Sequence, residues 1–125
     1  MSLPPYAELL DMAIEADTDG RRRLVLPFAG KVSGRPGFLH GGAIGGLLEV
    51  AAILGLRDAL GEDAAVVKPV TLTVDYMRGG REKTTYAIGI VRRLGTRVAN
   101  VDAIAWQDDR DQPIAAAQVT FLLRR

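Results

Sequence analysis

A long apolar segment near the middle of the chain is the clearest pattern in the sequence. Residues 41–56 read GGAIGGLLEVAAILGL, and every residue in this segment except Glu49 is apolar or glycine. A segment that is apolar on all sides predicts a buried helix rather than a surface one. We expect this helix to run from about Gly42 to Leu60 and to end at Gly61.

Two weaker patterns precede this helix. Apolar residues at positions 6, 9, 10, 13 and 14 follow helical spacing and predict a short amphipathic helix at about residues 4–16. The sequence DTDG at residues 17–20 predicts a turn. After it, residues 22–28 place Leu24, Leu26 and Phe28 on one face, which predicts a strand.

Four strand-like segments follow the apolar helix, at about residues 66–78, 83–94, 97–107 and 113–123. The turns between them are short, and short turns join antiparallel strands because a parallel crossover needs more residues. The whole pattern predicts an α+β fold, in which an antiparallel sheet of about five to six strands wraps around one long central helix. No linker divides the chain, so we expect a single domain over residues 1–125.

Composition and charge narrow the functional classes. The chain has 16 Lys and Arg against 15 Asp and Glu, a net charge of +1, which gives no electrostatic footprint for nucleic acid. It has no Cys and a single His, which excludes thiolate chemistry and argues against a metal site. No segment resembles a signal peptide or a confident membrane span. We therefore expect a cytoplasmic protein without nucleic-acid or membrane partners.

Glu49 and His40 are the candidate chemical groups. A carboxylate in an apolar helix loses hydration, so its pKa is expected to rise toward neutrality, as in many acid/base and nucleophilic sites. The alternative is a structural ion pair with an arginine. His40 stands directly before the helix in His40-Gly41-Gly42, where it can instead serve as a helix cap or bond a loop carbonyl.

Three motifs together resemble the hotdog-fold acyl-CoA thioesterases, and among them the PaaI-like branch. The first motif is GFLHGG at residues 37–42, followed by Glu49, nine residues after the histidine. The second is TLTVDYMR at residues 71–78, which is similar to the Tyr-Leu-Arg-Pro strand of the family. The third is GTR at residues 95–97, which resembles the family's Gly-Arg turn. The order of elements matches over roughly residues 20–123.

The resemblance implies hydrolysis of acyl-CoA thioesters. Glu49 matches the family's catalytic carboxylate, the Gly41 N–H matches the group that polarises the thioester carbonyl, and His40 matches a supporting loop histidine. Chemically, such a hydrolase needs a carboxylate and donors aimed at the developing oxyanion. The resemblance implies no metal, and no cofactor besides the coenzyme A of the substrate. The substrate-binding residues that it implies are Gly42, Arg78 and Arg97, with the arginines meeting the phosphates of coenzyme A.

The spacing of the candidate residues bears on assembly. Nine positions along a helix advance it by roughly 13 Å and turn it by about 180°. His40 and Glu49 of one chain therefore lie too far apart to share a small reacting centre. If both serve one site, they come from different chains, which agrees with the family, whose sites lie across dimer interfaces. We expect a homodimer or a dimer of dimers.

The chain departs from the family's pattern at three positions. Gly34 stands where many members carry Asn or Gln, Ile53 where some carry Ser or Thr, and Pro69 where Ser or Thr is common. Because polar helpers are missing, a non-catalytic acyl-CoA-binding protein stays open as an alternative. A hotdog dehydratase or hydratase is a weaker one, because the histidine of those enzymes precedes the Gly-rich turn.

Overall fold

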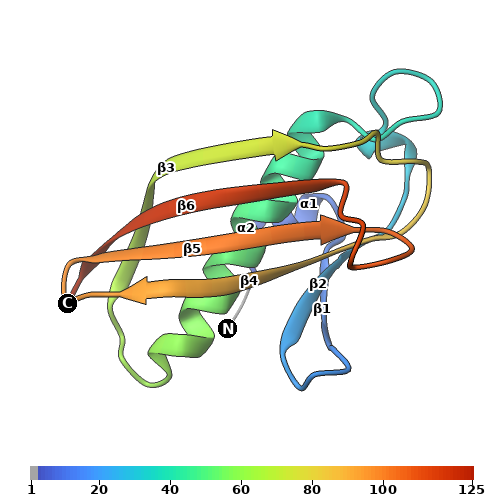
Figure 1. Cartoon of the computed structure of the whole chain (residues 1–125). Coiled ribbons are helices and arrows are strands. Elements are labelled where there is room, and N and C mark those ends of the chain that lie inside the picture. The colour runs from blue at the N-terminus through green and yellow to red at the C-terminus, as the bar shows by residue number, and fades with distance from the viewer. Residues whose placement is uncertain (1–2) are drawn as a thin grey trace.

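The computed structural model describes residues 3–125, which form one long helix packed on a curved antiparallel sheet (Figure 1). The helices and strands, in chain order, are α1 (Pro5–Leu9), β1 (Ala13–Ala16), β2 (Arg22–Leu26), α2 (Gly41–Leu60), β3 (Val66–Tyr76), β4 (Thr85–Leu94), β5 (Val98–Trp106) and β6 (Ala115–Arg124). A short 3-10 helix, Gly30–Val32, lies in the loop before α2. The predicted central helix and the four strands after it are confirmed, with ends that differ by a few residues at most.

The six strands form a single sheet in the order β1-β2-β4-β5-β6-β3, and every neighbouring pair is antiparallel. The predicted α+β architecture is therefore confirmed. β3 directly follows α2 in the chain but lies at the edge of the sheet, where β6 is its one neighbour among the strands of residues 3–125. An edge strand presents a row of unpaired backbone groups, so this position of β3 leaves it open to a further partner.

The helix α2 lies against one face of the sheet and forms the core with it. Its buried side chains include Leu47, Leu48 and Leu54, which are at most 1% exposed. The residues of β5 that face the helix are small and at most 1% exposed, which lets the helix approach closely; they are Ala99, Val101, Ala103 and Ala105. The closest approach is at Gly89 of β4, where an added Cβ would lie 2.4 Å from the Ala51 carbonyl oxygen.

The N-terminal segment differs from the predicted helix over residues 4–16. α1 has only five residues, and after it Asp11 adopts a left-handed φ of 59°. Residues Ala13–Ala16 instead form β1, in which Ile14 lies opposite Leu24 of β2. So short a helix has little stability of its own. Pairing with β2 therefore stabilises residues 13–16 as a strand, although Ala13 and Ile14 continue the helical spacing of apolar residues.

A buried carboxylate secures the turn between β1 and β2. Asp17 forms ion pairs with Arg23, at 3.4 Å, and with Arg110. The same guanidinium groups lie 4.3 and 4.6 Å from the ring centres of Tyr86 and Trp106, whose rings stack on each other with centres 5.9 Å apart. These ion pairs and ring contacts link the β1–β2 hairpin to Tyr86 and Trp106, on the face of the sheet opposite to α2.

Across residues 3–125, none of the helices combines the length and the apolar character that crossing a membrane requires.

Candidate functional site

The N-terminus of α2 is the first part of the candidate site. His40 is the N-cap residue, and its Nδ1 accepts a hydrogen bond of 2.8 Å from the Gly42 amide. Because Nδ1 accepts, the proton of the neutral ring is on Nε2. The amides of Ala43 and Ile44 both donate to the His40 carbonyl, at 3.0 and 3.2 Å. The predicted capping role of His40 is thus present.

The Gly41 amide differs from the other three amides of this first turn. Within residues 3–125 it has no hydrogen-bond acceptor. It points outward from the positive end of a 20-residue helix, where a backbone donor and the helix dipole both favour a partial negative charge. A carbonyl oxygen that develops negative charge fits this position.

Tyr76 holds the same backbone from the β3 side. Its hydroxyl donates a hydrogen bond of 2.8 Å to the Gly41 carbonyl. An added Cβ would lie 3.6 Å from the Tyr76 ring at Gly41 and 3.4 Å from the Tyr76 hydroxyl at Gly45. The Gly41–Gly42 peptide is therefore fixed at its oxygen by Tyr76 and at its N–H by His40. Tyr76 is the last residue of β3 and lies within the strand motif at residues 71–78, but no pattern in the sequence marked it as a site residue.

A cavity of about 580 Å3 opens beside this helix end, and Arg78 lies in its wall. Arg78 also donates to Gln112 at 3.0 Å. Nearby, the Phe38 ring lies between the guanidinium carbons of Arg35 and Arg81, which are 4.3 and 4.5 Å from the ring centre. The residues that line the cavity are Gly34, Arg35, Phe38, Leu39, His40, Gly41, Ile44, Tyr76, Met77, Arg78, Gly79 and Gly80. The mouth of this cavity is therefore cationic.

Glu49 lies two turns further along α2, on the face that the sheet leaves uncovered. Gly42, Gly46 and Ile53 share this face by their helical spacing, and none of them is fully buried. Glu49 is half-buried in the single chain, so the predicted complete burial is wrong, because the sheet covers the opposite side of the helix. Among residues 3–125 it forms no ion pair, so the alternative of a structural salt bridge finds no support.

The structure does not bring Glu49 and Gly41 of one chain together. α2 is continuous from Gly41 to Leu60. Glu49 follows Gly41 by eight residues, so the two lie roughly 12 Å apart along the helix axis. The contacts around them differ as well, since Gly41 touches Tyr76 of β3 while Glu49 lies on the side of α1. The predicted separation of the two groups within one chain is confirmed.

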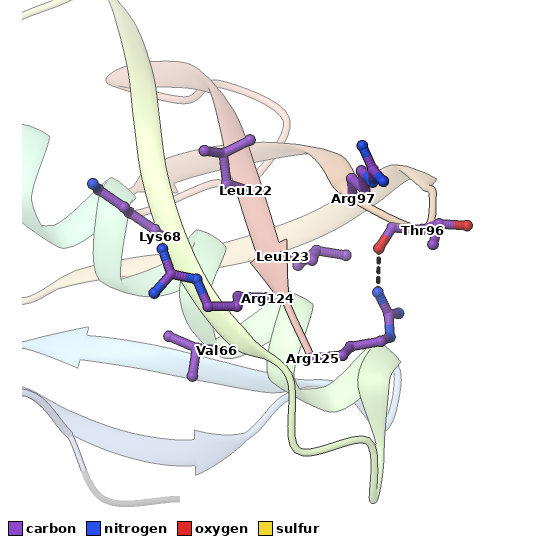
Figure 2. A pocket seen from close by; sticks show the side chains of 8 residues that line it. All are labelled: Val66, Lys68, Thr96, Arg97, Leu122, Leu123, Arg124 and Arg125. Carbon is purple, nitrogen blue, oxygen red and sulfur yellow. Dashed lines mark hydrogen bonds between the residues drawn. The ribbon is translucent and has the colours of Figure 1, made fainter.

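Arg97 lies in a different groove, at the opposite end of β3 from Arg78. This groove, of about 610 Å3, has a floor of Val66, Leu122 and Leu123 and carries the cationic side chains Lys68, Arg97, Arg124 and Arg125 (Figure 2). Arg125 donates to the Thr96 carbonyl and pairs with Asp63 at 3.0 Å. The other three cations have no carboxylate partner within residues 3–125.

The three departures from the family's pattern can now be placed. Gly34 lies against the backbone before α2, and a Cβ there would be 3.0 Å from the His40 Cα, so a larger residue would require a shift. Ile53 follows Glu49 by one turn on the same face. Pro69 sits at an irregularity in the pairing of β3 with β6, where an edge strand tolerates proline.

The chain matches known proteins in sequence. A family model described as the thioesterase superfamily matches residues 36–114. The chain is also 31% identical over 107 residues to a candidate esterase of Halobacterium salinarum, a match that covers 82% of this chain and 71% of that protein.

Solved structures match the fold over nearly the whole chain. A protein of Chromobacterium violaceum has a TM-score of 0.78 and 39% identity, and the match covers 97% of this chain and 84% of that one. A protein of Bacillus halodurans, crystallised with coenzyme A, has a TM-score of 0.84 and 21% identity, with coverage of 98% and 80%.

Proposed function

Since the chain belongs to the thioesterase superfamily and has its hotdog fold, we propose that it hydrolyses acyl-CoA thioesters. The observation that carries the proposal is the Gly41 amide, which lacks an acceptor within residues 3–125 although its neighbours in the first turn of α2 all have one. A preorganised donor of this kind stabilises the oxyanion of acyl transfer. The membership of the superfamily bears out the family resemblance stated from the sequence.

In the proposed reaction the thioester carbonyl oxygen accepts a hydrogen bond from the Gly41 N–H. The Glu49 carboxylate attacks the carbonyl carbon, or it takes a proton from a water molecule that attacks. If the carboxylate attacks, the C–S bond breaks as a mixed anhydride with Glu49 forms, and water then cleaves this anhydride to give the acyl carboxylate and free Glu49, while the remaining proton goes to the coenzyme A thiolate. If Glu49 activates water, the hydroxide adds to the carbonyl carbon, the C–S bond breaks, and the proton that Glu49 took passes to the leaving thiolate. His40 acts through the Gly42 amide, which it holds in place.

We propose further that two copies of the chain share each site. One continuous helix keeps Gly41 and Glu49 apart, so the Glu49 that serves a given Gly41 belongs to a second copy. The edge strand β3 supports pairing, because it is 11 residues long and carries exposed apolar side chains. Val66, Leu72 and Tyr76 of this strand are 63%, 39% and 55% exposed. Long apolar edges of this kind favour pairing with another chain.

The two groups of arginines fit the same arrangement. When two β3 strands pair antiparallel, the Val66 end of one lies beside the Tyr76 end of the other. The cationic groove around Arg97 of one chain then lies toward the Arg78 cavity of its partner. Both would serve the phosphates of coenzyme A, and the relative from Bacillus halodurans was crystallised with that molecule. Gly42 would serve the substrate through its place in the first turn, since its exposed backbone is held by His40.

A second candidate function is acyl-CoA binding without turnover. It is favoured by the lack of a polar side chain at Gly34 and Ile53, which lie beside the helix end and beside Glu49. In that case Glu49 would only position the acyl group.

The test is release of free thiol from a panel of aryl and aliphatic acyl-CoAs by the wild-type chain and by Glu49→Gln. Loss of a nucleophile or general base is expected to lower kcat by about 10²–10⁴-fold. Glu62→Gln, an exposed acid just beyond α2, is the matched control. Near wild-type turnover by Glu49→Gln would remove Glu49 from the mechanism, while binding of acyl-CoA without thiol release by the wild type would favour the second candidate.

Subunit complementation tests the shared site separately. Gly41→Pro removes the donor N–H at a helix position where proline is tolerated, so this variant and Glu49→Gln are each expected to be inactive alone. A mixed dimer contains one site with both groups intact and should recover activity. Heterodimers seen by native mass spectrometry without any return of activity would refute the shared site.

A further inference from the structure

Tyr6, which comes from the short N-terminal helix α1, lies on the same face of α2 as Glu49. Its hydroxyl is 3.4 Å from the Gly42 carbonyl oxygen, to which it donates. An added Cβ at Gly46 would lie 2.4 Å from the Tyr6 ring. The ring therefore lies along α2 between Gly42 and Glu49, in a space that exists because residue 46 is a glycine.

The surroundings of Tyr6 connect it with Glu49 electrostatically. Partial burial raises the pKa of the Tyr6 phenol above its usual value, and the negative charge of Glu49 raises it further. Both effects disfavour the phenolate, so the side chain stays neutral beside the carboxylate. Tyr6 is nevertheless 42% exposed in the single chain, and its outer side is open to a ligand or a second copy.

The two ends of the proposed site differ in polarity. The cavity at Gly41 is lined by Arg35 and Arg78, which suits the phosphates of coenzyme A. On the side of α2 that carries Glu49, the neighbouring residues that the structure describes include Tyr6, Gly46 and Ile53, none of which is charged. If the thioester carbonyl lies between Gly41 of one chain and Glu49 of the other, the coenzyme A arm leads to the arginines. The acyl group then extends over the apolar surface next to Glu49.

We propose that Tyr6 forms the end wall of the acyl-binding surface and limits the size of the acyl group that the site accepts. This inference rests on the proposed function, because it takes Glu49 as the group that meets the thioester. Tyr6 is a specificity-determining residue in this view. Its ring contacts the acyl group, while its hydroxyl bonds to Gly42 and keeps the ring in place.

A graded series of variants at one position tests the proposal. Tyr6→Phe keeps the ring, Tyr6→Leu shortens it to a branched aliphatic side chain, and Tyr6→Ala removes it. Leu9→Ala, which removes an exposed apolar side chain from the same helix, is the matched control. We would measure kcat/KM for straight-chain acyl-CoAs of increasing length and for phenylacetyl-CoA, after circular dichroism and native mass spectrometry have shown unchanged fold and assembly.

The expected result is a shift of preference toward longer or bulkier acyl groups that is larger for Tyr6→Ala than for Tyr6→Leu. For Tyr6→Ala, the ratio of kcat/KM between the longest and the shortest substrate should rise by about tenfold or more, since even one methylene in a pocket changes selectivity on this scale. Tyr6→Phe and Leu9→Ala should keep the wild-type optimum. An equal fall for all lengths in Tyr6→Ala, or no change, would overturn the proposal, because a purely structural role does not alter selectivity.

A binding measurement separates this inference from the proposed hydrolysis. Titration calorimetry with the same acyl-CoA series on Glu49→Gln, with and without Tyr6→Ala, reports dissociation constants without turnover. A shift of the optimum length in the double variant supports the role of Tyr6 even if the wild type releases no thiol. Turnover that depends on Glu49, combined with an unchanged length profile in Tyr6→Ala, would refute the role of Tyr6 alone.

Discussion

Replacing Gly89 of β4 with alanine should displace α2 and destabilise the protein. An added Cβ at this position would lie 2.4 Å from the Ala51 carbonyl oxygen and 2.9 Å from the Ala52 Cα. Ordinary contacts begin at 3.4 Å, so the helix and the strand must separate by about 1 Å. The obstructing atoms belong to the helix backbone, which cannot rotate away as a flexible side chain can.

The cost follows from the size of this misfit. Overpacking of a well-packed core costs about 1–3 kcal/mol and occasionally more. The replacement of glycine by alanine within a strand also stabilises the folded state by roughly 0.5–1 kcal/mol, because it lowers the conformational entropy of the unfolded chain. Because the obstructing atoms are helix backbone, the cost should lie near the upper end of its range, so we expect a net loss of about 2 kcal/mol in the free energy of unfolding. For a domain of this size the melting temperature should fall by roughly 3–5 °C per kcal/mol.

Urea denaturation and thermal unfolding followed by circular dichroism measure this loss. Gly30→Ala is the control, because nothing lies within 4 Å of the added Cβ. Gly55→Ala probes the same contact from the helix, since its Cβ would be 2.7 Å from the Gly89 carbonyl oxygen. The double variant should cost less than the two single losses added together, because one displacement relieves both contacts. A Gly89→Ala variant as stable as Gly30→Ala would refute the reasoning.

Three further perturbations test other parts of the structure. Asp17→Ala removes the buried carboxylate that pairs with Arg23 and Arg110. Chemical denaturation should show that the free energy of unfolding falls by about 1–3 kcal/mol. An unchanged denaturation midpoint would mean that these ion pairs do not stabilise the fold. The pKa of Tyr6 is raised above 10.0 in the folded chain, so the unfolding free energy should fall as the pH rises past that value. Ultraviolet titration should give a lower Tyr6 pKa in Glu49→Gln than in the wild type. An equal pKa in both would show that the charge of Glu49 does not act on Tyr6. Leu72→Lys puts a charge on the exposed edge strand, so it should weaken assembly in sedimentation experiments and abolish thiol release; a stable, active oligomer would place the interface elsewhere.

The sequence predicted the parts of the fold that depend on strong periodicity. The apolar run at residues 41–56 and the alternating strands after it dominate their local conformation, and their predicted ends lie within a few residues of those observed. β1 was missed because Ala13 and Ile14 continued a helical spacing by chance. The DTDG turn at residues 17–20 offered the missing signal, since a tight turn before one strand suggests a second strand on its other side.

The candidate site was predictable only in part. Motif spacing placed His40 and Gly41 at the helix end, and the structure has them there. The half-exposed state of Glu49 was not foreseen, because composition reports how apolar a helix is but not which side the sheet covers. The contact of Tyr6 with Gly46 joins positions 40 residues apart in the sequence, and no local pattern marks it. Arg78 and Arg97 lie in two different cavities. Their separation follows from the order of the strands in the sheet, which the residues next to each arginine in the sequence do not reveal.

The sheet order also sets the sequence of events during synthesis. α2 leaves the ribosome before β4, β5 and β6, the strands that cover most of it. β3 is made next, and the strand that it pairs with in the described part of the chain, β6, is translated last. A nascent chain that ends before β6 therefore carries an uncovered apolar helix and an unpaired strand, both of which invite aggregation. Native pairing must wait for distant segments, which is typical of folding on the millisecond-to-second scale. The proposed association through β3 therefore has to follow the synthesis of β6, the strand that places β3 in the sheet.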